Sequence, residues 1–529
     1  MIPRDLNNLN DIYAYYVQNN PPEKPVMGFN ERAITLAEMK QQVDLFTAHL
    51  AQLGVKPGVV VGYTLPTSPE AVYLFLAVSR LGGCAVPLFH MTPDRVKAEA
   101  FKRAGAQIAI TASPQFAAFK ESALQAGAAY RIATVDANPD ADYTFATPLP
   151  AGLDVNAGVL KQTPLQLPLL VASSSGTTGI PKTVLQTQGS VGAEIHTGIA
   201  LCLPLETYGK DKHTAMIAFP LSTAGITTCM GILLSGAFMT FSSDVSPVRF
   251  MQLVGHWQAD SLSAPPAYFE GILSLPMIDS FNLSTVRRVA TGMDFFSPSL
   301  LQRLKAKFVN LEAYVNGYGL IETTNVFMMC KRLSVAEFDL STTEMQVFDS
   351  AANAIEVRDD GGNLVPVGGE GELYVKGVNV VQGYVNNAEE TQKSFRDGWF
   401  KTGDIVRNEG ENRITLLGRQ KYLIKRGGKS VSPVVVQNHI NRLPGVKNSA
   451  VVGVPHPLYG EMVWAFVVNK AGSDVQLKDV MKHCRAELPN YMVPDQVSFI
   501  DDIPKNPGVG KVNYEALKEM AGKELEALK

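Results

Sequence analysis

Short apolar runs alternate with amphipathic stretches along the N-terminal third of the chain. The runs at 59–63, 84–88 and 107–111 each have the length of a buried strand. Residues 68–82 predict a helix, because a serine stands at its start, a proline in its first turn and a glycine at its end. Residues 92–105 predict a second capped helix, which opens with Thr-Pro-Asp-Arg. This order is typical of parallel sheets whose faces are covered by helices.

The pattern changes near residue 354. Residues 355–367 predict two strands joined by an Asp-Gly turn, and residues 371–377 predict another strand. Further on, strands are predicted at 451–454 and 464–468 within a compact α/β tail.

These patterns predict an α/β protein with two domains. Residues 1–419 are expected to form a large N-terminal domain of parallel or mixed α/β subdomains, whose last part, about 354–419, is a β-rich subdomain. Residues 420–529 are expected to form a small C-terminal α/β domain.

Composition narrows the class of protein. Of the 529 residues, 46% are hydrophobic and 18% are charged, so the chain can bury a large core, and a net charge of −3 leaves no basic footprint for nucleic acid. We see no apolar stretch long enough for a membrane span and no signal-peptide core at the start, so we expect a cytoplasmic protein. The five cysteines and eight histidines lack metal-ligand spacing, and we expect the cysteines to be buried apolar residues.

The loop at 173–182 carries the most specific chemistry of the chain. It reads Ser-Ser-Ser-Gly-Thr-Thr-Gly-Ile-Pro-Lys and follows the apolar run 167–172. Glycines let the backbone approach an anion, hydroxyls donate hydrogen bonds, and the lysine adds a positive charge. Pro181 stands where a Walker A loop needs its second glycine. A flexible surface loop has a similar composition, but the Thr-Thr-Gly-Ile-Pro-Lys ending favours a polyphosphate site.

Four further segments follow this loop in order. They are Asn-Gly-Tyr-Gly-Leu-Ile-Glu-Thr at 316–323, the Gly-Glu-Leu to Gly-Tyr stretch at 371–384, Trp-Phe-Lys-Thr-Gly-Asp to Gly-Arg-Gln-Lys at 399–421, and the loop 503–511. Together the five segments resemble the adenylate-forming superfamily, which comprises AMP-binding acyl- and aryl-CoA synthetases, peptide-synthetase adenylation domains and firefly-type luciferases. The resemblance spans roughly residues 30 to 520.

The resemblance implies a ligase that works in two steps with ATP, Mg²⁺ and a thiol. A carboxylate attacks the α-phosphorus of ATP, which releases pyrophosphate and leaves an acyl-adenylate. The thiol of coenzyme A, or the phosphopantetheine of a carrier protein, then takes the acyl group. The C-terminal domain is implied to be mobile and to rotate between the steps.

The resemblance also assigns the ATP site. Lys182 and the loop hydroxyls would hold the β- and γ-phosphates, Tyr318 would stack on adenine, and Asp404 would accept both ribose hydroxyls. The full set is Ser174, Ser175, Gly176, Thr177, Thr178, Gly179, Lys182, Gly317, Tyr318, Gly319, Asp404 and Arg419.

Three residues would act on the reacting groups. Lys511 matches the catalytic lysine, which would bridge the carboxylate and the α-phosphate. Glu322 matches the magnesium-binding glutamate, and Thr177 would be a second ligand; one carboxylate beside phosphate oxygens is enough for Mg²⁺. Arg419 would contact the ribose or a phosphate.

The remaining assignments concern the acyl group and the thiol. Ser222, Thr223 and Gly225 would line the acyl pocket, and Lys421 falls at the hinge position. Lys425 and Gly428 would face the active site during thioester formation, on the thiol-acceptor side.

The sequence departs from the family pattern at several positions. Ile321 replaces a threonine that contacts the α-phosphate, and Thr323 is the residue that could compensate. Thr183 replaces a glycine, Tyr422 an aspartate and Gln437 a glutamate. The final loop has one extra residue before Lys511, and the segment at 219–225 is one or two residues short.

The lack of acidic residues in one segment limits the class of the acid substrate. No acidic residue lies between Asp211 and Asp244, where an α-ammonium would need a partner, so a fatty or aryl acid is favoured over an α-amino acid. Two alternatives remain open: a stand-alone ligase that loads a separate carrier protein, and a degenerate adenylate-binding protein without catalysis.

Overall fold

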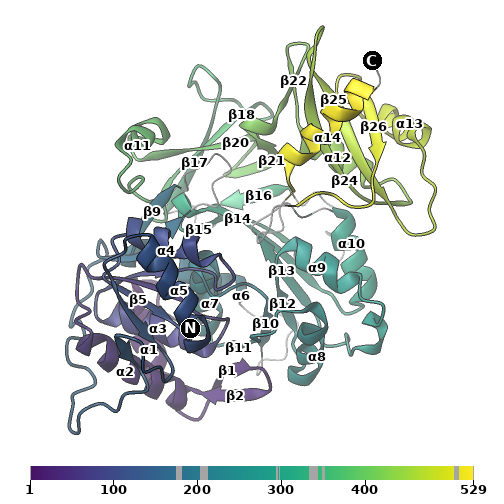
Figure 1. Ribbon diagram of the computed structural model, residues 1–529. Helices are drawn as coiled ribbons and strands as arrows, with labels where there is room; N and C mark the ends of the chain where they lie inside the picture. The colour runs from purple at the N-terminus through teal and green to yellow at the C-terminus, as the bar shows by residue number, and fades with distance from the viewer. Residues whose placement is uncertain are drawn as a thin grey trace.

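The computed structural model describes residues 2–173, 182–202, 213–292, 296, 298–332, 343–347, 352–505 and 512–527. Within them the chain forms three β-sheets with helices packed on their faces (Figure 1). No helix in these ranges is long and apolar enough to cross a lipid bilayer.

The first sheet has the strand order β7-β6-β5-β3-β4-β8-β9. Its strands run parallel except for the antiparallel pair β8–β9, which flanks the loop 174–181. The strands are β3 (Val60–Thr64), β4 (Cys84–Pro87), β5 (Ile108–Thr111), β6 (Arg131–Thr134), β7 (Tyr143–Thr144), β8 (Pro168–Ser173) and β9 (Thr183–Thr187). The alternation of strands and helices predicted for this region is confirmed.

Helices α1 (Leu9–Gln18), α2 (Leu36–Gln52), α3 (Pro69–Arg80), α4 (Asp94–Arg103) and α5 (Ser113–Gln125) accompany this sheet. α3 is apolar on nearly every side and is buried at Pro69 and from Ala71 to Ser79, as expected of a helix inside a core. Ser68 is its N-cap but makes no side-chain capping bond. The predicted cap at Thr92 is wrong, because α4 starts after Pro93, whose fixed φ already suits a helix entry.

The second sheet has 14 strands within the described residues and joins two kinds of pairing. Its parallel part is β1, β11, β10, β12, β13 and β14, with β2 antiparallel to β1; from β14 onward, through β15, β16, β21, β20, β18 and β17, every pair is antiparallel. β19 pairs with β20. The β-rich section is therefore continuous with the parallel section through β14 and β15.

The strands of this sheet are β1 (Pro25–Phe29), β2 (Arg32–Thr35), β10 (Thr214–Ile217), β11 (Phe238–Phe241), β12 (Ser261–Ser263), β13 (Arg288–Gly292), β14 (Ala313–Leu320), β15 (Asn325–Arg332), β16 (Glu344–Val347), β17 (Asn353–Arg358), β18 (Glu370–Gly377), β19 (Phe395–Arg396), β20 (Trp399–Gly410) and β21 (Arg413–Arg419). The helices that follow or precede them are α6 (Gln188–Cys202), α7 (Thr223–Leu234), α8 (Pro247–Trp257), α9 (Pro266–Leu273), α10 (Pro298–Lys307) and α11 (Ala388–Ser394).

The predicted hairpin at 355–367 is only half right. The first strand forms as β17, but beyond the turn only an isolated bridge joins Arg358 to Leu364, and β17 takes β18 as its partner. Pro366 has no N–H for a ladder, and the two glycines after Val367 end the extended run.

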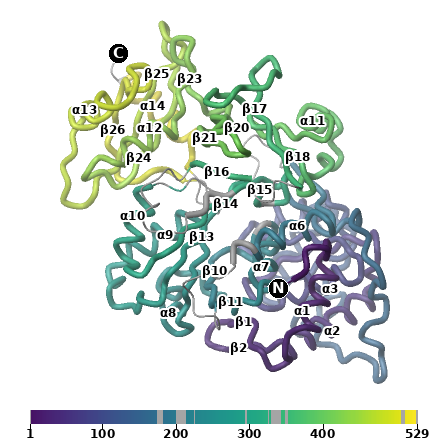
Figure 2. The backbone as a smooth tube through the Cα atoms, turned by 180° about the vertical axis from the view of Figure 1, so that it is seen from behind, coloured from purple at the N-terminus to yellow at the C-terminus, as the bar shows by residue number. Residues whose placement is uncertain are grey.

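The third sheet begins just after the short helix η4 (Gln420–Tyr422). It contains β22 (Ile424–Arg426), β23 (Lys429–Val431), β24 (Val446–His456), β25 (Gly460–Asn469) and β26 (Gln496–Phe499), with helices α12 (Pro433–Ile440), α13 (Leu477–Glu487) and α14 (Tyr514–Ala527). Separate apolar clusters fill its two faces. Seen from behind, this unit sits at one end of the molecule beside β21 (Figure 2).

Candidate active site

Asp404 lies at the centre of the most densely bonded part of the site. The Tyr318 hydroxyl donates to its Oδ2 at 2.6 Å, and Arg419 Nε contacts its Oδ1 at 2.9 Å. Asp404 and Arg419 are directly opposite each other on β20 and β21, whereas Tyr318 reaches in from β14. The sheet thus joins three side chains that are far apart in the sequence.

Burial controls the electrostatics of this group. Asp404 is only 4% exposed, and this burial raises the pKa of its carboxyl, while the Arg419 guanidinium opposes the shift. Burial and the neighbouring Asp404 charge hold the Tyr318 pKa well above its usual value, so Tyr318 is a hydrogen-bond donor at neutral pH. Glu322 acts electrostatically on both Asp404 and Arg419, so it belongs to the same site.

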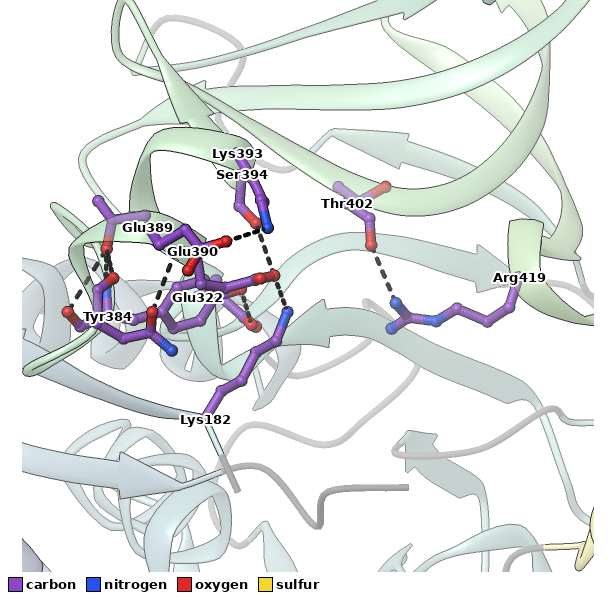
Figure 3. Close-up of polar contacts among 11 residues, drawn as sticks. Lys182, Glu322, Tyr384, Glu389, Glu390, Lys393, Ser394, Thr402 and Arg419 are labelled. Atoms are coloured by element: carbon purple, nitrogen blue, oxygen red, sulfur yellow. Dashed lines mark hydrogen bonds and ion pairs between the residues drawn. The ribbon is translucent and has the colours of Figure 1, made fainter. Parts of the chain in front are cut away.

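The backbone of β20 just before Asp404 fixes the direction of its side chain. Thr402 donates to the Leu373 carbonyl at 2.8 Å and accepts from the Asp404 N–H at 3.0 Å. Gly403 has φ +76°, a conformation that favours glycine. Arg419 also donates to the Thr402 carbonyl at 2.9 Å, which ties this part of β20 to β21 (Figure 3). The Thr-Gly-Asp sequence is therefore an irregular stretch of β20 that presents one carboxylate.

Glu322 is held by a tyrosine from a distant segment. It lies on the short helix η2 (Ile321–Thr323), is 8% exposed, and accepts a hydrogen bond from the Tyr384 hydroxyl at 2.8 Å. Burial and the Glu322 charge raise the pKa of Tyr384 far above its usual value, which keeps its proton available for this bond.

Lys182 reaches the same cluster from the other side. Its Nζ forms an ion pair with Glu390 of α11 and lies 4.9 Å from the centre of the Tyr384 ring (Figure 3). Lys182 directly precedes β9, and β9 meets the Tyr384 segment through a bridge between Val184 and Tyr384. Lys182, Glu322 and Tyr384 therefore form one cluster at the start of β9.

The structure gives local reasons for two departures from the family pattern. Ile321 packs on a small apolar cluster that includes Val184 and Tyr384. The Thr183 hydroxyl lies 3.1 Å from that of Ser173, and the two residues form a cross-strand pair of β8 and β9. Both side chains therefore have structural contacts of their own.

Thr323 does not present its hydroxyl to the site. The side chain is fully buried, accepts from the Leu320 N–H at 2.9 Å and donates to the Leu320 carbonyl at 3.1 Å. We therefore do not assign it the compensating role that the sequence suggested.

Gly317 and Gly319 lie on β14 on either side of Tyr318. Gly317 pairs with Gly292 on one side, and a Cβ on it would come within 3.1 Å of the Val326 side chain on the other. The strand is therefore packed tightly here.

Ser222, Thr223 and Gly225 lie together at the start of α7. Ser222 is the N-cap, and Thr223 has φ +30° and donates to the Pro87 carbonyl at 3.2 Å. A Cβ at Gly225 would lie 1.8 Å from the Pro220 carbonyl oxygen, so only glycine fits. This turn is tied to β4 of the first sheet.

Lys421, Lys425 and Gly428 lie in the segment that enters the third sheet. Lys421 belongs to η4, and its Nζ lies 4.7 Å from the centre of the Tyr422 ring. Lys425 donates to the Ser430 hydroxyl at 2.8 Å, and Gly428 has φ +77°. Tyr422 stacks on Tyr514 with ring centres 4.5 Å apart. Lys425 does not contact the Asp404 group in this arrangement.

Several candidates lie outside the described residues. These are Ser174, Ser175, Gly176, Thr177, Thr178, Gly179 and Lys511.

Among the described residues, no three His, Cys, Asp or Glu side chains gather as they would around a metal ion. Glu322 fits a different kind of site. Its near-buried carboxylate, which shares Tyr384 as a neighbour with Lys182, suits Mg²⁺ that takes its other ligands from phosphate and water. Of the cysteines, Cys84, Cys229 and Cys484 are buried, as predicted.

Sequence reasoning missed Tyr384 and Glu390. Tyr384 was noted only as the end of a motif, and no pattern linked Glu390 to Lys182, which lies 208 residues away. It also missed Glu194 of α6, a carboxyl that is 2% exposed and accepts a bond from the Val326 N–H at 3.2 Å.

A nucleotide-dependent enzyme is the class that this fold and site define. Residues 15–385 match the family model described as AMP-binding enzyme, and residues 436–509 match the AMP-binding enzyme C-terminal domain. The chain belongs to the AMP-binding enzyme family.

Two curated relatives match nearly the whole chain. One is a feruloyl-CoA synthase of an Amycolatopsis species, 29% identical, with 91% of this chain and 92% of the relative covered. The other is 4-coumarate–CoA ligase 2 of Nicotiana tabacum, 27% identical, with 92% of this chain and 89% of the relative covered.

The fold also matches solved structures. The amide bond synthetase McbA of Marinactinospora thermotolerans has a TM-score of 0.84 at 23% identity, covering 96% of this chain and 99% of that one. ATP-bound MatB of Rhodopseudomonas palustris has a TM-score of 0.79 at 24% identity, covering 97% and 99%.

Proposed function

We propose that the protein is an acid–thiol ligase that activates a fatty or aryl carboxylic acid with ATP and passes the acyl group to coenzyme A. The observation that carries the proposal is the buried Tyr318–Asp404–Arg419 group with Glu322 in its electrostatic range. Asp404 offers a carboxylate for the ribose. Glu322 and Lys182 offer a carboxylate and an ammonium group for the phosphates.

Asp404 would receive the ribose. A carboxylate has about four acceptor positions, and Tyr318 and Arg419 use one on each oxygen. Two positions therefore remain for the two ribose hydroxyls. Arg419 would keep the carboxylate ionised and fixed while the sugar binds.

Lys182 and Glu322 would act at the phosphates. Bringing a carboxylate to ATP joins two anions, so positioning and charge neutralisation dominate the barrier. When bound, Mg²⁺ would neutralise phosphate charge, and Glu322, with Thr177, would hold it. Lys182 would hold the phosphates that leave as pyrophosphate.

We assign to residues 420–529 the lysine of the first half-reaction and the residues that face the thiol in the second. Lys511 would bridge the carboxylate and the α-phosphate; at a separation of about 4 Å this is worth about 4 kcal/mol, or about a thousandfold in rate. Rotation about Lys421 would then bring Lys425 and Gly428 to the thiol. We place the domain boundary at Gln420.

The acceptor and the acid follow from the relatives. Both matched relatives are named for coenzyme A thioesters of aromatic acids, which supports coenzyme A as the acceptor and favours the aryl acid of the two classes. A separate carrier protein would be the alternative acceptor. Because ATP and coenzyme A are cytoplasmic metabolites, we place the reaction in the cytoplasm.

Pyrophosphate release tests the proposal. The enzyme is supplied with ATP, Mg²⁺ and a panel of fatty, aryl and amino acids, with and without coenzyme A. We expect release with an aryl or fatty acid, and a thioester only when coenzyme A is present. Release without a thioester would favour a carrier protein, and no release with any acid would favour a non-catalytic adenylate-binding protein.

Lys511→Ala separates the two half-reactions. We expect adenylate formation to fall about a thousandfold, while thioester formation from supplied acyl-adenylate stays close to wild type. An equal loss in both would contradict either the lysine's role or the rotation.

A further inference from the structure

Glu390 and Lys182 form a contact that ATP binding would have to break. The Glu390 carboxylate is the ion-pair partner of Lys182, the lysine proposed to hold the terminal phosphates (Figure 3). A free anion and a side-chain carboxylate would thus compete for one ammonium group.

The position of Glu390 is set by the fold and not by Lys182 alone. The Asn387 side chain caps α11 by accepting from the Glu390 N–H at 3.1 Å. The Val385 N–H donates to the Thr183 carbonyl at 2.8 Å, which pins the start of this segment to β9. Ser394 donates to the same Glu390 oxygen at 3.3 Å. The carboxylate therefore stays near the lysine when the ion pair is broken.

The exposure of the pair makes it reversible. The side chains of Lys182 and Glu390 are 39% and 28% exposed, so water and salt screen their attraction. The Lys182 ammonium lowers the pKa of Glu390, so the carboxylate is ionised at neutral pH. Such a pair is weak enough for a polyphosphate to displace it and strong enough to affect affinity.

We propose that Glu390 is an internal counter-ion that competes with the terminal phosphates of ATP for Lys182. It neutralises Lys182 in the free enzyme, yields it to the nucleotide, and takes it back as pyrophosphate departs. The inference rests on the proposed function, because it assumes that Lys182 holds these phosphates. Glu390 touches no reacting atom and acts through Lys182.

The consequence is that weaker binding of ATP accompanies faster release of pyrophosphate. Stabilising the free form of Lys182 weakens the binding of both ATP and pyrophosphate by the same factor. It also assists pyrophosphate departure, because a replacement anion is already beside the lysine.

Glu390→Gln removes the charge and keeps the shape. We expect the KM for ATP and the inhibition constant for pyrophosphate to fall together by about two- to fivefold, the range for a partly exposed ion pair. Pyrophosphate release should slow. Raising the salt concentration should shrink the difference from wild type, which a purely structural role would not produce.

Two controls sharpen the test. Glu389→Gln removes a neighbouring charge that pairs with Lys393 at 2.7 Å, and its side chain is 81% exposed. It should leave both constants unchanged. In a Lys182→Gln background, Glu390→Gln should have no further effect on either constant, since the competing ammonium is gone.

The outcomes distinguish this inference from the proposed function. If wild type binds ATP in calorimetry but Glu390→Gln leaves both constants unchanged, the counter-ion role is wrong. A higher KM for ATP in Glu390→Gln would also overturn it, because Glu390 would then be orienting Lys182 for the nucleotide. If wild type binds neither ATP nor pyrophosphate, the proposed function itself fails.

Discussion

Asp404 holds two donors at once, the Tyr318 hydroxyl and the Arg419 guanidinium, while only 4% of its surface is exposed. Asp404→Asn keeps the shape but loses the charge that would bind the ribose. We expect the KM for ATP to rise about 10- to 100-fold, which corresponds to about 1.5–3 kcal/mol for a charged hydrogen bond. Steady-state kinetics at varied ATP measure this.

Asp397→Asn is the matched control. Asp397 lies just before β20, and its side chain is 87% exposed. The KM for ATP should not change in this variant. Equal effects in the two variants would contradict a ribose role for Asp404.

Glu194 predicts a pH dependence of stability. Burial raises the pKa of its carboxyl well above the ordinary value. The unfolded chain therefore releases this proton at a lower pH than the folded protein, so the group destabilises the fold increasingly as pH rises above the ordinary glutamate pKa. Glu194→Gln should remove this decline and melt higher than wild type at neutral and alkaline pH.

Thermal melting between about pH 5 and about pH 9 measures the effect. Glu121→Gln, at an exposed position on α5, controls for the loss of a charge. Wild-type and Glu194→Gln curves that stay parallel across this range would show that Glu194 is not buried as a neutral acid.

At the scale of elements, the turn into α7 depends on one glycine. Gly225→Ala would place a Cβ 1.8 Å from the Pro220 carbonyl oxygen, so the turn must open. We expect a loss of about 1–3 kcal/mol in the free energy of unfolding, as for an overpacked core site. Urea denaturation measures it.

Gly255→Ala is the control for this change. Gly255 lies within α8, and nothing stands within 4 Å of its missing Cβ. Alanine there should stabilise the protein by about 0.5–1 kcal/mol through helix propensity. A loss of equal size at both positions would show that the effect at Gly225 does not come from the clash.

Local sequence patterns predicted the positions of strands better than they predicted which strands pair. The strands at β3, β4 and β5 follow from short apolar runs, because a buried parallel strand needs little else. β17 was placed correctly, but its partner was not, since the choice between residue 364 and β18 depends on the whole sheet.

The residues of the site also divide into those that local motifs predict and those that only the fold brings together. Motifs singled out Asp404, Arg419 and Glu322, because each stands in a short recognisable segment. Tyr384 and Glu390 reach the site only through the pairing of β9 with a distant segment, which no local pattern contains.

At the scale of the whole molecule, a hydrogen bond at the start of α12 joins the third sheet's unit to the second sheet. The Ser432 hydroxyl caps α12 by accepting from the Val435 N–H at 3.2 Å, and it donates to the Leu417 carbonyl of β21. The proposed rotation about Lys421 would break the second bond. Ser432→Ala should therefore change the ratio of the two half-reaction rates by about fivefold, as for one lost hydrogen bond.

Ser246→Ala is the control that separates the two roles of Ser432. Ser246 caps α8 by accepting from the Arg249 N–H at 3.3 Å. Both alanine variants should lose about 1 kcal/mol from the missing cap, but only Ser432→Ala should shift the ratio of rates. An unchanged ratio would mean that this bond does not resist the rotation.

The continuous second sheet also has a consequence for synthesis of the protein. Tyr318 and Asp404 are 86 residues apart, and Arg419 comes later still, yet their side chains meet across strands of one sheet. A chain growing on the ribosome can complete its N-terminal sheet early, because domains fold as their residues emerge. It cannot form the Asp404 contacts until Arg419 has left the exit tunnel. Nucleotide affinity should therefore arise abruptly and late during translation.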